Sequence, residues 1–383
     1  MIKLSVNDAI GRRLAHDLSR FADTPAECGY SNDRTPFRRG HVVTKDDVPL
    51  LLSMGKENLF VLEDVEDEYN SKHSAYTTIE SGSISCKRTQ QAAVKVHEEA
   101  AAARLASLCR NTGIVEAAVK EGKIEMFAGS KGLFRVDTER QRRINSINGI
   151  VIATRNSLTA VNGGNGEVGD KLAAVKVIPL EIEDDLLKQA ENIAGTSPLF
   201  DLLPYVLKTA ALVITGNEIK DGRIKDEFAP LVCARLNRLG IELVKKVITG
   251  DGCQNIVDGI VQVQSEKPDI ILCTGGMSVD PDDNTPAAII KSGAAVVTYG
   301  APILPGSMFM LAYFNDGTPI LGVPGGALYK KDRGGILDIV LPRLAAGIKM
   351  TKDDFIVLGN GGLCLSCDVC HYPVCSYGKA VSI

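Results

Sequence analysis

Residues 269–286 read DIILCTGGMSVDPDDNTP and decide the fold of the second half of the chain. The apolar run at 270–273 is too short for a helix and rich in β-branched residues, which predicts a buried strand. It breaks at Thr274-Gly275-Gly276, where two glycines can adopt φ > 0 and let a ligand approach the backbone. A helix is predicted to start at 284–286, Asn-Thr-Pro, because a capping residue precedes Pro.

A strand, a glycine turn and a helix N-terminus together offer free N–H groups to a phosphate. The same loop carries Asp280, Asp282 and Asp283. These carboxylates would repel an anion directly, so they make sense mainly where a divalent cation bridges them to it. The stretch therefore predicts a phosphorylated small molecule bound with Mg²⁺.

Length and composition indicate an ordinary globular protein. A chain of 383 residues has room for two or three domains, and 45% apolar with 23% charged residues is usual for such proteins. The net charge of -4 gives no reason to expect nucleic acid or an anionic membrane as partner. Asp8, Arg12 and Arg13 interrupt the start, so no signal peptide is expected. The uncharged stretch 292–315 is broken by Gly and Pro and is interpreted as core strands and a loop. We expect a cytoplasmic protein.

The first half, residues 1–204, is predicted to hold two small α+β lobes joined by a linker at about 65–90. Apolar residues at helical spacing predict a helix near the start, over 5–14. Residues 172–182 are predicted to form a strand. His97-Glu98-Glu99 lacks the second His of a H-E-x-x-H zinc motif, so we interpret it as a solvated helix face.

From about residue 205 strands and helices alternate. Strands are predicted at 211–214, 241–248, 270–273 and 319–323, separated by helical segments, and this rhythm predicts parallel pairing. Residues 205–350 are therefore expected to form a three-layer α/β/α domain with a mostly parallel sheet. Each of these strands ends in a glycine turn, and ligands of such sheets bind beyond the carboxyl ends of the strands.

Residues 205–350 resemble the molybdopterin-binding domain shared by molybdopterin adenylyltransferases, molybdate insertases and gephyrin. The resemblance rests on the following residues: Thr215-Gly216-Asn217-Glu218, Asp226, the Asp251 loop, Thr274-Gly275-Gly276-Met277-Ser278-Val279 with Asp283, and Gly322-Val323-Pro324-Gly325. The first half is more loosely similar to the accessory domains of the insertases.

The resemblance implies Mg²⁺-dependent chemistry on adenylylated molybdopterin. It implies catalytic roles for Glu218, Asp251 and Asp283, with Asp251 and Asp283 as Mg²⁺ ligands. The residues it implies to contact phosphate and pterin are Thr215, Gly216, Asp226, Thr274, Gly275, Gly276, Met277, Ser278, Pro324 and Gly325. Asp226 could instead cap its helix. Glu218 and Asp251 could be ordinary loop acids.

The sequence departs from the insertases in three ways. The turn at 303–308 reads ILPGSM and lacks the lysine pair of the insertases, so an oxyanion there would lose its charge-assisted bonds. The paired acids of the Asp251 loop are reduced to Asp251-Gly252. Residues 351–383 are too few for the carboxy-terminal β-barrel of that family.

A cysteine cluster stands in place of that barrel. Cys364, Cys367, Cys370 and Cys375 have the spacing C-x₂-C-x₂-C-x₄-C, which is close to a run that holds a [4Fe–4S] cluster. Zinc with four cysteines, or with His371 in place of one, is the alternative. Sulfur transfer or binding of soft molybdenum is a third possibility. Residues 351–383 are therefore predicted to be a metal-binding tail, and we expect removal of 361–383 to spare pterin binding.

We interpret the chain as a molybdopterin-binding protein of molybdenum-cofactor biosynthesis and favour an enzyme, a transferase similar to the molybdotransferases. One alternative is a non-catalytic carrier or sensor that delivers the cofactor to an apoenzyme. Another is a nucleotide pyrophosphatase like the competence-damage-inducible family. The expected partners are a pterin, a recipient molybdoenzyme and a second copy of the chain in a homodimer, with no nucleic acid and no membrane.

Overall fold

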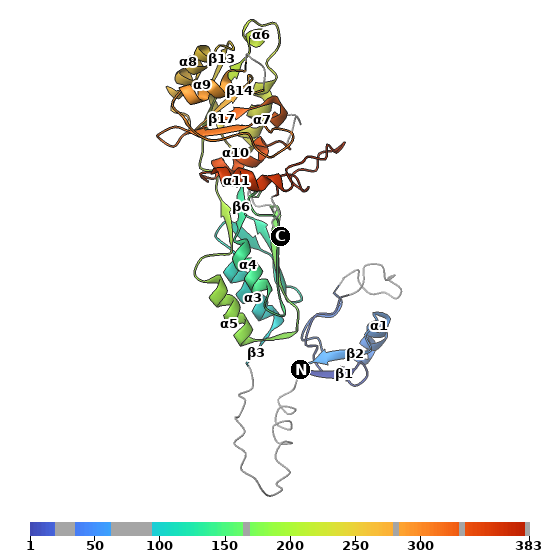
Figure 1. The fold of residues 1–383 in the computed structure, drawn as a ribbon. Helices are drawn as coiled ribbons and strands as arrows, with labels where there is room; N and C mark the ends of the chain where they lie inside the picture. Colours follow the sequence, from blue (N-terminus) through green and yellow to red (C-terminus); the bar gives the residue numbers. More distant parts are fainter. Residues whose placement is uncertain (20–34, 63–93, 164–168, 279–282, 329–333, 380–383) are drawn as a thin grey trace, which may run out of the picture.

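The fold is taken from a computed structural model that describes residues 1–19, 35–62, 94–163, 169–278, 283–328 and 334–379. Figure 1 shows a small lobe near the N-terminus, a second lobe around helices α3 to α5, and an α/β domain at the far end of the molecule. The predicted linker at 65–90 lies outside the described residues.

The first lobe pairs β1 (Ile2–Ser5) antiparallel with β2 (Asn58–Val61) beside η1 (Lys45–Asp47) and α1 (Val48–Ser53). The helix predicted over 5–14 is wrong, because these residues form turns after β1. Ile2 pairs with Val61 in the strand, and Leu14 bridges to Val61 as well. Contacts far along the chain therefore outweigh the local helical spacing.

The second lobe contains three small antiparallel sheets. The four-stranded sheet has the order β4-β5-β9-β7, the three-stranded sheet β11-β6-β8, and the third pairs β10 with β3. The predicted strand 172–182 is two strands in different sheets, β9 and β10. The elements are β3 (Lys95–His97), α3 (Glu98–Cys109), β4 (Ile114–Glu116), β5 (Lys123–Ala128), β6 (Gly132–Val136), α4 (Thr138–Asn145), β7 (Ile150–Thr154), β8 (Thr159–Val161), β9 (Lys171–Val177), β10 (Glu181–Glu183), α5 (Asp184–Ala194) and β11 (Phe200–Leu203).

Glu98 lies at the start of α3 and is only 6% exposed, so its interpretation as part of a solvated face is wrong. Burial raises the pKa of this carboxyl group. His97 Nδ1 accepts a hydrogen bond from the Glu99 backbone N–H at 3.3 Å, which makes His97 the cap of the helix.

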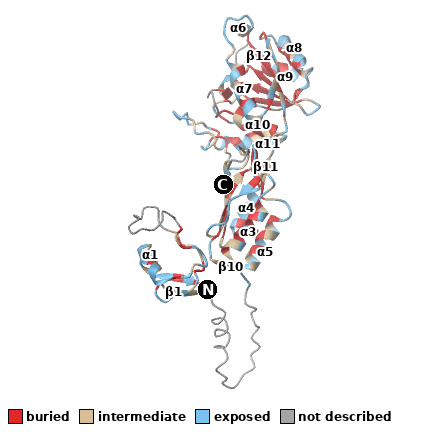
Figure 2. Ribbon diagram, turned by 180° about the vertical axis from the view of Figure 1, so that it is seen from behind, coloured by how far each residue is buried: buried red, intermediate tan, exposed pale blue. Residues whose placement is uncertain are grey.

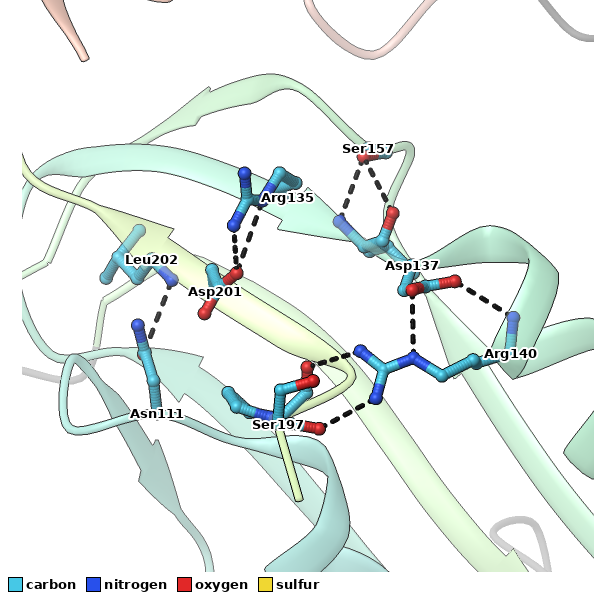
Figure 3. Close-up of polar contacts among 10 residues, drawn as sticks. Asn111, Arg135, Asp137, Arg140, Ser157, Ser197, Asp201 and Leu202 are labelled. Atoms are coloured by element: carbon cyan, nitrogen blue, oxygen red, sulfur yellow. Dashed lines mark hydrogen bonds and ion pairs between the residues drawn. The ribbon is translucent and has the colours of Figure 1, made fainter. Parts of the chain in front are cut away.

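Polar contacts hold β11 against β6, just before the chain enters the α/β domain (Figure 3). Arg135 Nη2 lies 2.5 Å from Asp201 Oδ2 across the two strands. The Leu202 backbone N–H donates to Asn111 Oδ1 at 3.3 Å. The Arg140 guanidinium donates to the Ser197 carbonyl at 2.8 Å. These bonds fix the end of the second lobe in position.

The α/β domain is built on a six-stranded sheet of order β13-β12-β14-β17-β16-β15. β12 pairs in parallel with β13 and β14, β14 pairs in parallel with β17, and β16 runs antiparallel to both β15 and β17. The elements are β12 (Thr209–Thr215), α6 (Asn217–Lys220), α7 (Phe228–Leu239), β13 (Glu242–Thr249), α8 (Cys253–Gln264), β14 (Ile270–Thr274), α9 (Thr285–Lys291), β15 (Ala295–Tyr299), β16 (Met310–Tyr313), β17 (Pro319–Val323), η2 (Gly325–Leu328), α10 (Leu337–Ala345), α11 (Lys352–Ile356) and η3 (Val357–Gly359).

The predicted three-layer, mostly parallel fold is confirmed. Leu236 of α7 and Leu341 of α10 pack in one cluster with Leu272 of β14. Ile260 of α8 and Ile289 of α9 pack in another, on the opposite face of the sheet. Figure 2 shows the buried strands between these helices. The uncharged stretch 292–315 contains β15 and β16, as predicted. Among the described residues we find no helix with the length and apolar character to cross a membrane.

Candidate functional site

A pocket of about 710 Å³ lies beyond the carboxyl ends of β12, β13, β14 and β17, and we call it the strand-end pocket. Parallel strands bring the turn after each of them to this one edge. The described residues that line it are Thr215, Gly216, Glu218, Phe228, Asp251, Gly275, Gly276, Met277, Ser278, Asp283, Gly306, Ser307, Met308, Pro324, Gly325 and Gly326.

The strand-end pocket brings together all three predicted catalytic acids with most of the predicted substrate contacts. Asp226 is not in its lining. Its Oδ1 accepts hydrogen bonds from the backbone N–H groups of Phe228 and Ala229 at 2.9 Å each, which caps helix α7. Thr274 is fully buried at the end of β14 and also lies outside the lining.

Thr215 carries a buried hydroxyl group at the wall of the strand-end pocket. The residue is 2% exposed, and its Oγ1 has no hydrogen-bond partner among the described residues. Thr274 Oγ1, on the neighbouring strand, is in the same situation. A buried hydroxyl without a partner costs free energy of about 1–3 kcal/mol. Of these two hydroxyl groups only that of Thr215 belongs to a residue that lines the pocket, so it is the one that a ligand could satisfy.

The glycine turn after β14 fits tightly against Thr215. Gly275 has φ +87°, and a Cβ built on it would lie 2.4 Å from the Thr215 carbonyl oxygen. Gly276 has φ +54°, and its Cβ would lie 2.9 Å from Thr285 Oγ1. Thr285 Oγ1 in turn donates to the Gly275 carbonyl at 2.8 Å. Only glycine fits both positions, so the turn exposes backbone rather than side chains to the pocket.

Asp251 connects the turns after three strands. Its Oδ2 accepts a hydrogen bond from the Asn217 backbone N–H at 2.9 Å, after β12. Its backbone carbonyl accepts from Asn284 Nδ2 at 3.0 Å, after β14. Asn284 was predicted to cap α9, but its side chain makes no capping bond there. Asp251 therefore also shapes the pocket.

The wall of the strand-end pocket is acidic. Glu218, Asp251 and Asp283 line it, and no Lys or Arg is among the described lining residues. The Glu218 carboxylate makes no hydrogen bond within the described part of the chain. In that same part, no three His, Cys, Asp or Glu side chains are grouped as a ready-made metal site.

The sequence did not identify Phe228, Gly306, Ser307, Met308 and Gly326 as lining residues. The turn containing Gly306, Ser307 and Met308 had been singled out only for the lysines it lacks. Phe228 reaches the pocket from the first turn of α7, and no motif pointed to it.

The cysteine tail lies apart from the strand-end pocket. Cys364, Cys367, Cys370 and Cys375 line a separate hollow of about 40 Å³ together with His371, which we call the tail hollow. Their side chains share this hollow but do not form a preassembled metal site.

A further cavity of about 320 Å³ lies between the second lobe, helices α7 and α10, and residues 372–374. Arg155 pairs with Asp170, whereas Arg235 and Arg238 both pair with Asp338. Both carboxylates of this cavity are thus already paired with arginine, so neither is available to hold a divalent cation, and the chemistry points to the strand-end pocket.

A family described as a probable molybdopterin binding domain matches residues 211–346. A family described as a domain of unknown function matches residues 3–63.

Among curated proteins, a CinA-like protein of Mycobacterium sp. (strain MCS) is 34% identical over 82 residues, which are 21% of this chain and 20% of that protein. A CinA-like protein of Geotalea daltonii is 33% identical over 107 residues, 28% of this chain and 24% of that protein. A probable FAD synthase of Caenorhabditis briggsae is 36% identical over 82 residues, 21% and 16% of the two chains. The chain thus covers about a fifth of the length of these relatives.

Among solved structures, a molybdopterin biosynthesis protein of Pyrococcus horikosii aligns at 16% identity and a TM-score of 0.31, over 66% of this chain and 80% of that one. A tungsten cofactor synthesizing protein of Pyrococcus furiosus aligns at 15% identity and a TM-score of 0.32, over 38% and 98% of the two chains.

Proposed function

We propose, from the premise that residues 211–346 belong to the molybdopterin-binding domain family, that the strand-end pocket binds a phosphorylated pterin together with Mg²⁺. The observation that carries this proposal is the buried Thr215 hydroxyl, which lacks a partner among the described residues and lies against the glycine turn. A phosphate or pterin oxygen could complete its hydrogen bonding.

The charges of the pocket support a cation. Three carboxylates without a lining Lys or Arg would repel a phosphate on its own. Mg²⁺ is usually held by one or two carboxylates together with substrate phosphates and water, so it does not need a closed cage of protein ligands. Asp251 and Asp283 would hold it, and Glu218 would orient water. The bound cation would neutralise charge that develops on a phosphoanhydride.

We further propose that the protein acts on adenylylated molybdopterin as a transferase. Asp283 and Glu218 come from different turns and line the same pocket, which supports roles for both at a bound phosphate. Ser307 and Met308 occupy the turn where the insertases are expected to carry lysines. A cofactor carrier without catalysis is therefore the alternative on the same pocket.

The CinA-like relatives favour a second candidate function, the hydrolysis of a nucleotide pyrophosphate such as ADP-ribose, which the resemblance to the competence-damage-inducible family implies. The same acids and the same glycine turn would serve this reaction, because both substrates contain a phosphoanhydride.

One set of incubations separates these candidates. Purified protein is titrated calorimetrically with molybdopterin, with Mg²⁺ and then with a chelator, and adenylylated molybdopterin and ADP-ribose are assayed for AMP release. Mg²⁺-dependent AMP release from the pterin supports the transferase. Binding without release supports the carrier, and cleavage of ADP-ribose alone supports the pyrophosphatase. If no heat of binding appears with the pterin under either condition, the proposal is wrong.

A further inference from the structure

The two ends of the cysteine tail are anchored on the α/β domain. Cys364 and Cys375 pack against the same apolar cluster as Leu341 and Phe355. Tyr377 is 3% exposed, and the Gly378 backbone N–H donates to the Gly361 carbonyl at 2.9 Å, which closes the segment into a loop. The first and last cysteines are therefore held near each other by the fold.

The middle of the loop is open. Cys367 is exposed and Cys370 is partly exposed. All four cysteines and His371 line the tail hollow of about 40 Å³. Four sulfur ligands around one hollow are the ligand set of a structural zinc site, in which each sulfur lies about 2.3 Å from the ion. Metal binding commonly orders its ligands, so Cys367 and Cys370 need not be preassembled.

One cation, Lys379, lies near Cys375 of the tail hollow. One zinc ion with four thiolates carries two negative charges after the thiols release their protons. The Lys379 ammonium group lies close enough to Cys375 for a thiolate there to interact with it electrostatically. Arg343 has no acidic partner within 4 Å among the described residues, and its guanidinium donates only to the Ile339 carbonyl. A negative metal–thiolate centre would be stabilised by the nearby Lys379 ammonium group.

The tail is also bonded to the wall of the strand-end pocket. The Leu304 backbone N–H donates to the Gly362 carbonyl, and the Cys364 N–H donates to the Leu304 carbonyl, each at 2.8 Å. Tyr377 Oη donates to the Pro305 carbonyl at 3.2 Å. The next residues, 306–308, line the strand-end pocket. The position of Cys364 is thus linked directly to that turn.

We propose that Cys364, Cys367, Cys370 and Cys375 bind one zinc ion, and that the zinc-bound tail braces the turn 303–308 beside the strand-end pocket. The zinc site stands independently, whereas its effect on ligand affinity rests on the proposed function. This inference replaces the expectation that removal of 361–383 spares pterin binding.

The zinc site is tested by metal analysis of the full chain purified without oxygen and loaded with zinc. We expect one zinc per chain, with loss of zinc in the double variant Cys367→Ser/Cys370→Ser. Cys233→Ser, on helix α7 away from the tail, is the matched control and keeps its zinc. Four irons per chain with inorganic sulfide, or no stoichiometric metal, overturns the zinc site.

The bracing is tested by hydrogen exchange without any ligand. Removal of zinc with a chelator should make a peptide spanning 303–308 exchange several times faster, whereas a peptide from β13, at the other edge of the sheet, stays unchanged. Equal exchange at 303–308 overturns the bracing. Pterin affinity is then compared with and without zinc, and a drop without zinc is expected. An unchanged affinity overturns the coupling, whereas absence of pterin binding in both states overturns only the proposed function.

Discussion

The Asp251 carboxylate accepts a hydrogen bond from the backbone N–H of Asn217, with 2.9 Å between Oδ2 and N. An acid predicted to bind magnesium is thus already used to join two turns of the pocket. Its second carboxylate oxygen is the one left for a cation. Structural and cation-binding roles can therefore be separated by the choice of substitution.

Asp251→Asn should weaken Mg²⁺-dependent pterin binding while stability is retained, because an amide oxygen can still accept from Asn217. Asp251→Ala should in addition lower the free energy of unfolding by about 1–3 kcal/mol, since the Asn217 N–H loses its partner. Urea unfolding and calorimetry measure the two effects.

Asp283→Asn should remove the Mg²⁺ dependence with little change in stability. Asp258→Asn, exposed on α8, controls for loss of one negative charge. Full Mg²⁺ dependence in Asp283→Asn would contradict the assignment.

Thr215→Val should leave the free energy of unfolding unchanged or raise it, because it removes a buried hydroxyl that lacks a partner. The same substitution should weaken pterin binding by about tenfold, which corresponds to the free energy of one lost hydrogen bond. Thr285→Val is the matched control, since that hydroxyl is bonded to the Gly275 carbonyl. It should cost about 1 kcal/mol of stability. If Thr215→Val destabilises as much as Thr285→Val, the hydroxyl serves the fold and not a ligand.

Gly275→Ala should destabilise the domain and abolish ligand binding, because the new Cβ would collide with the Thr215 carbonyl oxygen. Gly317→Ala isolates the cost of the backbone conformation, since Gly317 has φ +90° and nothing within 4 Å of its Cβ position. The free energy of unfolding of this control variant should fall by about 1–2 kcal/mol. Unfolding by urea measures both variants. If both variants lose the same free energy of unfolding, the close contact between Gly275 and Thr215 does not contribute to stability.

Ser307→Lys should raise the affinity of the pocket for molybdate by about tenfold, because a lysine there can form a charge-assisted hydrogen bond to an oxyanion. Equilibrium dialysis with molybdate measures the change. Ser307→Gln supplies similar length without charge and should leave the affinity as it is. A rise of the same size in both variants would refute the electrostatic reason.

Asp269 makes stability depend on pH. Burial on its own would raise its pKa, but hydrogen bonds from the backbone N–H groups of Lys208 and Thr209 outweigh burial and lower it. A lowered pKa in the folded state gives stability that is present above the unfolded value of about 3.9 and is lost as pH falls through the folded value. Asp269→Ala, which removes the acceptor of both N–H groups, should therefore cost about 1–2 kcal/mol at neutral pH and progressively less in acid. Urea midpoints at several pH values measure this, and a constant difference would contradict it.

The sequence predicted secondary structure correctly where a short run of neighbouring residues is enough to determine it. Residues 270–273 form a strand that is buried along its whole length, and the glycines that follow have the positive φ expected of them. At the chain start, Val6, Ala9 and Leu14 are buried as their spacing suggests, but Val6 and Ala9 lie in turns and Leu14 bridges to Val61.

The succession of strands and glycine turns along residues 205–350 can be predicted from local residues, because short apolar runs and Gly-Gly pairs have few stable conformations. Three relationships are visible only in the folded chain: Asp226 caps a helix, Ser307 lines the pocket, and the cysteine tail is bonded to the turn that contains Ser307. These relationships join residues far apart along the chain, and only the packing of the sheet and its helices brings them together.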